Sequence, residues 1–308
     1  MSRPTRILVT GAGGQVGLDL LDVLAGATPL GGDRDFQPDG AAIGADEFEV
    51  LGLTRRELDI TDRDAVRRAL DSARPDVVVH LAAYTAVDRA EVEAPSCFAV
   101  NATGTESLSI AAGELGAHLI SISTDYVFDG AKGAAYVEGD EPNPLNVYGA
   151  SKLAGELLCS DEDTVVRTSW VMGVRGKNVV HVIADRAAAG GTVRFVNDQT
   201  GTVTVASDLA RCLATMVRER PGGTWHVANS GTTTWFDVAA FVGTTLGRGD
   251  DFATAIVTSD LDPVPLATRP TRSDLSTARF AARWRALPDW REGVGRLVRD
   301  RALRGGSS

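Results

Sequence analysis

The stretch RILVTGAGGQVG, residues 6–17, runs from apolar, β-branched residues through closely spaced glycines into a helix-forming segment. This order predicts a strand, a tight turn and a helix, which is the start of a β–α–β unit. A helix that begins at such a turn offers free backbone N–H groups to a phosphate. An ordinary β–α turn is the alternative, but the position after the first strand favours a dinucleotide site. Its expected contacts are Gly11, Gly14, Gln15, Val16 and Gly17.

The same order of elements repeats along the first half of the chain. Apolar runs at 48–54, 76–83 and 118–124 alternate with amphipathic segments at 62–73 and 101–115. The runs are too apolar for a sheet with one solvated face, so they predict a parallel sheet covered by helices on both faces. We therefore expect an α/β fold, a Rossmann-like doubly wound parallel sheet with a smaller C-terminal substrate-binding domain.

The regular alternation weakens beyond about Trp170, where Gly- and Thr-rich turns separate shorter helices. The run from Thr204 to Arg218, followed by GTWHVANSG, looks like a further helix and strand that return to the main sheet. We expect an NAD(P)-binding domain and a substrate-binding domain, the first spanning 1–170 together with 204–230 and the second spanning 171–203 and 231–308.

The segment from Ala27 to Glu47 is rich in Gly, Pro and Asp and has no apolar period. It is expected to be a surface insertion. Because it follows the first helix, we expect it beside the adenosine end of the cofactor site, which it would lengthen or cover.

The chain has 31 lysines and arginines against 41 aspartates and glutamates, a net charge of −10. This balance opposes nonspecific attraction to nucleic acids and anionic membranes, so neither is expected as a partner. The cysteines, Cys97, Cys159 and Cys212, form no CxxC pair and predict no disulfide framework. No apolar leader precedes the first strand and no apolar run reaches about 20 residues, so a cytoplasmic location is expected.

The end of the second strand bears on the choice of dinucleotide. NAD-binding proteins place a carboxylate there, on the ribose hydroxyls. This chain has Thr54, Arg55 and Arg56 instead, and guanidinium groups suit a 2′-phosphate. The pattern favours NADPH, with NADH as the alternative. Two solvated surface arginines are the other interpretation, and the neighbouring Glu57 supports it.

Tyr148 and Lys152 are four residues apart, so on a helix they share one face. An ammonium beside the phenol would lower the tyrosine pKa and make it a usable proton donor or acceptor. The run HLISIST ends with Ser123 and Thr124, and ligands of open α/β sheets bind at the carboxyl ends of strands. A hydroxyl from either residue would polarise a carbonyl there.

These features resemble the extended short-chain dehydrogenase/reductases, and among them the dTDP-4-dehydrorhamnose reductase group. The resemblance extends from near residue 6 to near residue 280. The motifs that carry it are TGAGGQVG (10–17), LDITD (58–62), AAYTAVDRAE (82–91), NATG (101–104), STDYVFDG (123–130), PLNVYGASKLAGE (144–156), VRTSW (166–170), NDQTG (197–201), GTWHVANSGTTTWFDVA (223–239) and RPTRSDL (269–275). Two departures are Met172, where the group usually has Tyr, and Val203, where it usually has Pro.

The resemblance implies a hydride transfer from NAD(P)H to the C4 ketone of dTDP-4-dehydro-6-deoxy-L-mannose, giving dTDP-L-rhamnose. Tyr148 would protonate the C4 alkoxide, and Lys152 would tune Tyr148 and hold the nicotinamide ribose. Thr124 would hydrogen-bond near the reacting oxygen.

The resemblance also implies binding residues. For the cofactor these are Thr54, Arg55, Asp59, Ile60, Ala82, Ala83, Tyr84, Tyr148 and Lys152, in addition to the glycine-rich turn. For the sugar nucleotide they are Thr85, Thr124, Asp125, Tyr126, Trp170, Asn197, Gln199 and Arg269, whose guanidinium suits the diphosphate.

Several of these residues have structural alternatives. Asp59 is also suited to cap the helix near Asp62, and Trp170 follows an apolar strand and is suited to the core. Asn101 is treated as structural because it opens a helix. The histidines share no metal-ligand spacing, so no metal site is assigned, and any Mg²⁺ requirement stays open.

Two alternative functions remain. One is a related sugar-nucleotide epimerase or dehydratase, although a 4,6-dehydratase is expected to have an acid pair after Thr124, where this chain has Asp125 and Tyr126. The other is a non-catalytic nucleotide-binding subunit, like the regulatory partner of methionine adenosyltransferase. A homodimer is compatible with either.

Overall fold

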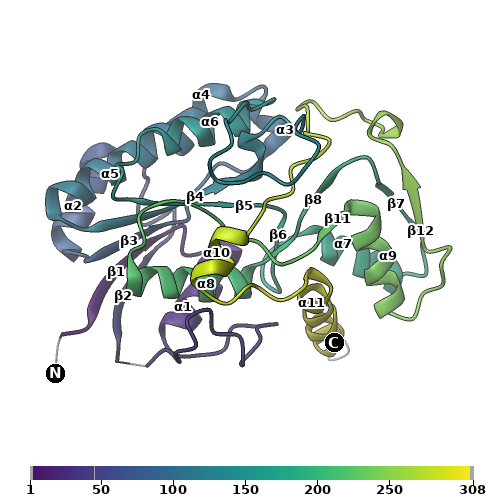
Figure 1. The fold of residues 1–308 in the computed structure, drawn as a ribbon, viewed down its shortest axis with the longest axis horizontal. Coiled ribbons are helices and arrows are strands. Elements are labelled where there is room, and N and C mark those ends of the chain that lie inside the picture. Colours follow the sequence, from purple (N-terminus) through teal and green to yellow (C-terminus); the bar gives the residue numbers. More distant parts are fainter. Residues whose placement is uncertain (1–2, 45, 306–308) are drawn as a thin grey trace.

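The computed structural model describes residues 3–44 and 46–305. Its centre is a six-stranded parallel sheet in the order β10-β5-β4-β3-β1-β2 (Figure 1). The α/β, Rossmann-like prediction is therefore confirmed. The strands are β1 (Thr5–Thr10), β2 (Phe48–Leu53), β3 (Val77–His80), β4 (His118–Thr124), β5 (Thr164–Thr168) and β10 (Gly223–His226).

Helices cover both faces of this sheet. Successive strand residues point to opposite sides, so apolar side chains lie on both faces and both must be buried. Ile7 and Val9 of β1 lie in one core cluster, while Leu8 lies in another. Figure 1 shows α1 and α8 below the sheet and α2, α5 and α6 above it. Their bounds are α1 (Gln15–Leu24), α8 (Ala206–Glu219), α2 (Arg63–Ala73), α5 (Gly104–Leu115) and α6 (Val147–Glu156).

Polar caps determine where several helices begin. Asp62 accepts a hydrogen bond from the backbone N–H of Ala65 and starts α2. Asp59 accepts instead from the backbone N–H and hydroxyl of Thr61, so the alternative that Asp59 caps this helix is wrong. Short helical turns connect β3 to α5 and follow β4: α3 (Val87–Ala90), α4 (Ala94–Phe98), a π-helical turn η1 (Ala99–Thr103) and a 3₁₀ turn η2 (Asp125–Val127).

Most of the remaining elements form a smaller region with its own apolar core, which includes Val180 of α7, Val242 of α9 and Val294 of α11. The exception is α10, which packs on β10 and places Phe280 in the main core. Three two-stranded ladders belong to it: β6 with β9, β7 with β12, and antiparallel β8 with β11. The bounds are β6 (Val171–Met172), α7 (Val179–Ala188), β7 (Val193–Val196), β8 (Thr200–Thr202), β9 (Thr204–Val205), β11 (Thr232–Thr234), α9 (Trp235–Thr245), β12 (Ala253–Ile256), η3 (Thr258–Asp260), α10 (Ala278–Arg283) and α11 (Trp290–Gly305).

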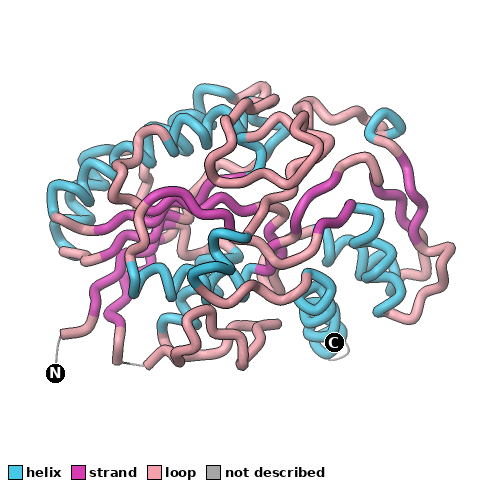
Figure 2. Tube along the Cα trace, in the orientation of Figure 1, coloured by secondary structure: helices cyan, strands magenta, loops and turns pink. Residues whose placement is uncertain are grey.

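The segment between α1 and β2 does not lie where the sequence predicted. It is loop in its described residues (Figure 2), and it packs against α8 and the C-terminal region. Arg218 of α8 bonds both Asp39 and Glu47, and Phe36 is buried in the main core. The position beside the adenosine end is therefore wrong. The segment enters β2 at its amino end, whereas Thr54 follows the carboxyl end.

Among the described residues, no helix combines the length and the apolar character that a membrane crossing requires. The same part of the chain contains no group of three or more His, Cys, Asp or Glu side chains placed to hold a metal ion.

Candidate active site

The glycine-rich turn after β1 is shaped for close backbone approach. Gly11 has φ +68°, and a Cβ atom there would lie 2.5 Å from the backbone nitrogen of Ala82. A Cβ on Gly17 would lie 2.5 Å from the carbonyl oxygen of Gly11. Gly14 takes the N-cap position of α1, and the first turn that follows is uncharged, so its N–H groups face outward without an anionic competitor. The turn fits a dinucleotide pyrophosphate.

Gln15 contributes to this turn through its backbone, because its side chain faces the smaller region. Its Oε1 accepts hydrogen bonds from the backbone N–H of Gly173 and from Nδ2 of Asn178, both at 3.0 Å. A Cβ on Gly176 would lie 2.8 Å from Cγ of Gln15. The Gln15 carboxamide is therefore packed against the turn at 173–178, while Val16 follows it in the first turn of α1.

The adenosine end is open to solvent. Arg55 and Arg56 are exposed, while the N–H and hydroxyl of Thr54 both donate to Glu57, at 2.8 and 2.7 Å. The Thr54 side chain is thus already bonded within the turn. Asp59 lies nearby, exposed, and Ile60 is buried in the core that contains Leu108.

The segment after β3 is held by Asn101 of the π-helical turn. Oδ1 of Asn101 accepts from the backbone N–H of Tyr84 at 2.8 Å, and its Nδ2 donates to the Tyr84 carbonyl at 3.0 Å. Nδ2 also donates to Oγ of Ser151, beside Lys152. The structural interpretation of Asn101 is confirmed, since it ties three segments together. Ala82 and Ala83 are half-buried and Thr85 is exposed.

Thr124 ends β4, and Tyr148 and Lys152 lie one turn apart on α6, which packs against β4. Tyr148 is hydrogen-bonded to the Thr124 side chain, and its ring meets that of Tyr126 edge-on at 6.1 Å. Gly149 permits this approach, because a Cβ there would lie 2.1 Å from the carbonyl oxygen of Tyr126. Thr124, rather than Ser123, is therefore the hydroxyl that faces the tyrosine.

The expected electrostatic effect of Lys152 on Tyr148 is wrong for this structure. Burial raises the pKa of the Tyr148 hydroxyl above its ordinary value, and the bond with Thr124 only partly opposes this. Burial also lowers the pKa of Lys152 to about 8, against the opposing charge of Glu156. Tyr148 is thus a neutral phenol at neutral pH, which is the form that donates a proton.

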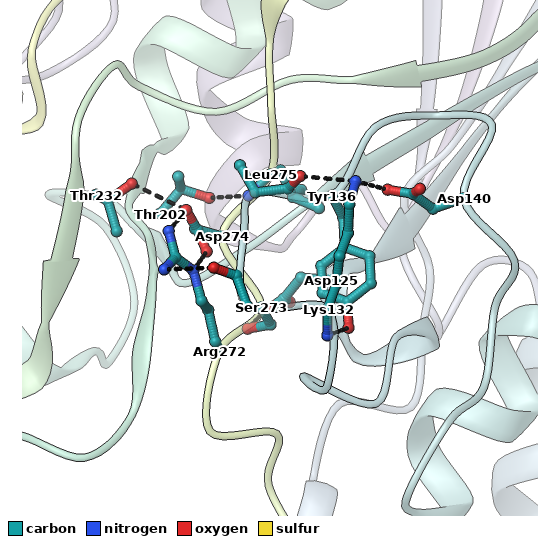
Figure 3. Close-up of polar contacts among 12 residues, drawn as sticks. Asp125, Lys132, Tyr136, Asp140, Thr202, Thr232, Arg272, Ser273, Asp274 and Leu275 are labelled. Atoms are coloured by element: carbon teal, nitrogen blue, oxygen red, sulfur yellow. Dashed lines mark hydrogen bonds and ion pairs between the residues drawn. The ribbon is translucent and has the colours of Figure 1, made fainter.

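The C-terminal segment 268–275 runs past Asp125, the residue that follows β4, with Ser273 beside it (Figure 3). Ser273 Oγ donates to Oδ2 of Asp125 at 2.5 Å, and Thr124 Oγ1 donates to Oδ1 at 3.0 Å. Asp125 is only 2% exposed, so its carboxyl group is held within the protein. The motif RPTRSDL contributes to the family resemblance, but the sequence alone predicts no role for Ser273.

A cavity of about 350 Å³ lies in the smaller region. Gln199, Trp235 and Arg269 line it, together with Val179, Arg194, Phe195, Val196, Leu261 and Pro265. Asn197 is in the same loop as Gln199, and its backbone N–H bonds the Ile256 carbonyl. Sequence reasoning missed Arg194 and Trp235, since an isolated Arg in a short strand carries no signal.

Two predicted residues connect this cavity to its surroundings. Trp170 stacks on Trp235 at 4.0 Å between ring centroids, and its backbone is held at φ +44°, which is rare for a bulky residue. Arg269 pairs with Asp88 at 2.7 Å and is hydrogen-bonded to Tyr126. The bond from Arg269 lowers the pKa of Asp88 to about 2. Arg269 thus lies between the cavity and Tyr126.

Comparisons with known proteins extend over nearly the whole chain. Residues 40–302 match the family model described as RmlD substrate binding domain. A dTDP-4-dehydrorhamnose reductase of Mycolicibacterium smegmatis is 40% identical over 94% of this chain and 84% of its own length. One from Burkholderia thailandensis is 36% identical over 96% of this chain and 98% of its own.

A solved structure also matches this chain over nearly its whole length. The dTDP-4-dehydrorhamnose reductase of Bacillus anthracis in complex with NADP has a TM-score of 0.84 and 30% identity, covering 96% of this chain and 98% of that one. The chain therefore belongs to the dTDP-4-dehydrorhamnose reductase family.

Proposed function

We propose that this protein reduces the C4 ketone of dTDP-4-dehydro-6-deoxy-L-mannose to a hydroxyl, giving dTDP-L-rhamnose. The observation that carries the proposal is the placement of Tyr148 beside Thr124 and Tyr126 at the carboxyl end of β4, with Lys152 one helical turn further along α6. Relatives named as dTDP-4-dehydrorhamnose reductases along nearly the full chain support it.

Reduction of a ketone requires a hydride at carbon and a proton at oxygen. Bound NADPH supplies the hydride to C4. Tyr148, as a neutral phenol, donates its proton to the C4 oxygen as negative charge develops there. Thr124 offers a hydroxyl to the same oxygen, and Lys152, one helical turn after Tyr148 on α6, would hold the nicotinamide ribose.

We propose NADPH as the preferred cofactor, bound along Gly11 to Gly17. The exposed guanidinium groups of Arg55 and Arg56 at the end of β2 suit a 2′-phosphate. The Bacillus anthracis relative is described in complex with NADP, which supports this choice. We place Asp59 and Ile60 near the adenine, and Ala82, Ala83 and Tyr84 along the bound dinucleotide.

The sugar nucleotide is proposed to lie from Tyr148 to the cavity. Arg269 and Arg194 line that cavity and supply two cations for the diphosphate. Thr85, Tyr126, Trp170, Asn197 and Gln199 complete the proposed contacts. In this arrangement the division into 1–170 with 204–230, and 171–203 with 231–308, separates cofactor binding from substrate binding. Residues 1–2, 45 and 306–308 of that division lie outside the described residues.

The test is loss of reduced-nicotinamide absorbance when the purified protein meets dTDP-4-dehydro-6-deoxy-L-mannose, with NADPH and NADH tried separately. Stoichiometric oxidation with formation of dTDP-L-rhamnose supports the proposal. Conversion of a sugar nucleotide without net cofactor oxidation indicates an epimerase or dehydratase. Cofactor binding without turnover of any keto-sugar indicates a regulatory subunit.

A further inference from the structure

Asp125 is placed to control the hydroxyl of Thr124 rather than to touch the substrate. It is 2% exposed, and both carboxyl oxygens are bonded within the protein, to Thr124 at 3.0 Å and to Ser273 at 2.5 Å. Figure 3 shows Ser273 beside Asp125, where the 268–275 segment runs past that residue.

The bond to Asp125 uses the one proton that the Thr124 hydroxyl has. Thr124 Oγ1 donates to the carboxylate and accepts from the backbone N–H of Tyr126 at 3.2 Å. In this state Thr124 has no proton left for a substrate oxygen. When Asp125 is protonated, the direction of the bond reverses, because the acid donates to Oγ1. The Thr124 proton is then free to turn toward Tyr148 and the reacting oxygen.

We propose that Asp125 is a positioning residue whose protonated form turns the Thr124 hydroxyl toward the C4 oxygen of the sugar, so that reduction proceeds on the enzyme with Asp125 protonated. The inference rests on the proposed ketone reduction. Asp125 keeps its proton throughout, and the proton that reaches the C4 oxygen comes from Tyr148.

The surroundings favour the protonated form near neutral pH. Burial raises the pKa of Asp125 to about 7, although the hydrogen bonds from Ser273 and Thr124 act in the opposite direction. The titratable groups that face it are Tyr126 and Tyr148, both of which burial keeps neutral. The charged groups on the elements packed around it are Lys152 of α6, Arg269, which pairs with Asp88, and Arg272, which pairs with Asp274.

The substitution Asp125→Asn separates this role from a merely structural one. An amide at this position accepts from Ser273 and donates to Thr124, as the protonated acid does, but it does not titrate. The ratio of D125N to wild-type kcat is therefore expected to rise roughly tenfold for each pH unit above about 7. Taking the ratio cancels the titration of Lys152, which both enzymes share.

Asp19→Asn is the matched control. Asp19 of α1 is as deeply buried as Asp125, burial raises its pKa to about 7 as well, and it pairs with Arg175. The pH dependence of kcat in D19N is expected to follow wild type. Ser273→Ala gives a second test, because it removes a donor that stabilises the carboxylate. The fall in kcat at alkaline pH should move to higher pH in S273A.

A readout without turnover completes the test. The infrared absorption of protonated carboxyl groups is expected to decrease between about pH 6 and about pH 9. Asp125 should contribute some of the absorption that is lost, and this contribution should be missing in D125N. A D125N to wild-type ratio that stays flat with pH, or a folded D125N that is inactive, overturns the proposal. So does an Asp125 carboxyl band that is already absent at neutral pH. Wild-type protein that fails to reduce the keto-sugar contradicts the proposed function instead, while the infrared titration still reports on Asp125.

Discussion

Asn178 donates a hydrogen bond from Nδ2 to Oε1 of Gln15 at 3.0 Å, which joins the glycine-rich turn to the start of α7. Oδ1 of Asn178 accepts from the backbone N–H of His181 and caps that helix. The next residue, Val179, lines the cavity. The turn proposed to hold the cofactor and one wall of the proposed substrate site are therefore one hydrogen-bonded unit.

Gln15→Leu is expected to weaken substrate binding although Gln15 does not line the cavity. The variant keeps the size of the side chain and removes the acceptor of two hydrogen bonds, so the cap of α7 loses its support. Loss of such a bond costs about 0.5–1.5 kcal/mol, which predicts a rise of about two- to thirteenfold in KM for the sugar nucleotide.

The rise in KM for the sugar nucleotide should be separable from any change in cofactor binding. Asn178→Asp keeps the cap acceptor and removes only the donor, so it should reproduce the rise in KM. The dissociation constant for NADPH, measured by fluorescence titration, should change less than KM does in both variants. An unchanged KM in both would show that the two sites are independent.

Tyr148→Phe should abolish most turnover and spare binding. It removes the hydroxyl that donates to the C4 oxygen, and general-acid groups contribute roughly 10²–10⁴-fold to rate. We expect kcat to fall by at least about a hundredfold, with little change in the dissociation constant for NADPH.

Tyr136→Phe is the matched control for that experiment. Tyr136 is also a buried tyrosine, but its hydroxyl donates to Asp129 in the loop after β4. Its kcat should stay near wild type. Full activity in Y148F, measured by absorbance of the reduced cofactor, would refute the assignment of Tyr148 as proton donor.

The double substitution of Arg55 and Arg56 by Ala should reduce the preference for NADPH over NADH. Both side chains are exposed at the end of β2, and a charge-assisted hydrogen bond contributes about 1.5–3 kcal/mol. The ratio of kcat/KM for the two cofactors should fall by about ten- to a hundredfold. Arg68→Ala, an exposed arginine on α2, should leave the ratio as it is. Equal losses of kcat/KM with NADPH and NADH would refute the proposed contact between these arginines and the 2′-phosphate.

Local sequence pattern was enough to predict the fold and the helix that carries Tyr148 and Lys152. Apolar runs such as 76–83 are continuous because both faces of a parallel sheet are buried, and Tyr148 and Lys152 share a helix face by their spacing alone. The strand-end position of Thr124 was also predictable, because strand ends of a parallel sheet meet at one edge, but this rule left Ser123 and Thr124 as alternatives.

Contacts between distant residues were beyond such reasoning. Ser273 and Asp125 are 148 positions apart, and the bond between them depends on the path of the C-terminal segment past Asp125. The pKa of Tyr148 depends on burial, which the Tyr-to-Lys spacing does not contain. In the same way, the segment from Ala27 to Glu47 looks polar throughout, because its one aromatic residue has no periodic partner.

Phe36 is therefore expected to contribute strongly to stability, although its neighbours in the sequence are polar. It is 1% exposed, in the core that also contains residues of the sheet and of α8, while Arg218 holds the part of the segment that follows it, through Asp39 and Glu47. Phe36→Ala is expected to lower the free energy of unfolding by about 3–5 kcal/mol, through lost burial and a cavity. Asp35→Ala, an exposed neighbour, should change it by less than about 0.5 kcal/mol. Urea unfolding of the three proteins gives both values.

The same variant tests where the segment lies. Because the segment packs on the helix face of the sheet and enters β2 at the end opposite Thr54, KM for NADPH should be unchanged in F36A at temperatures where it is folded. A large rise in that KM with little loss of stability would place the segment at the cofactor site after all.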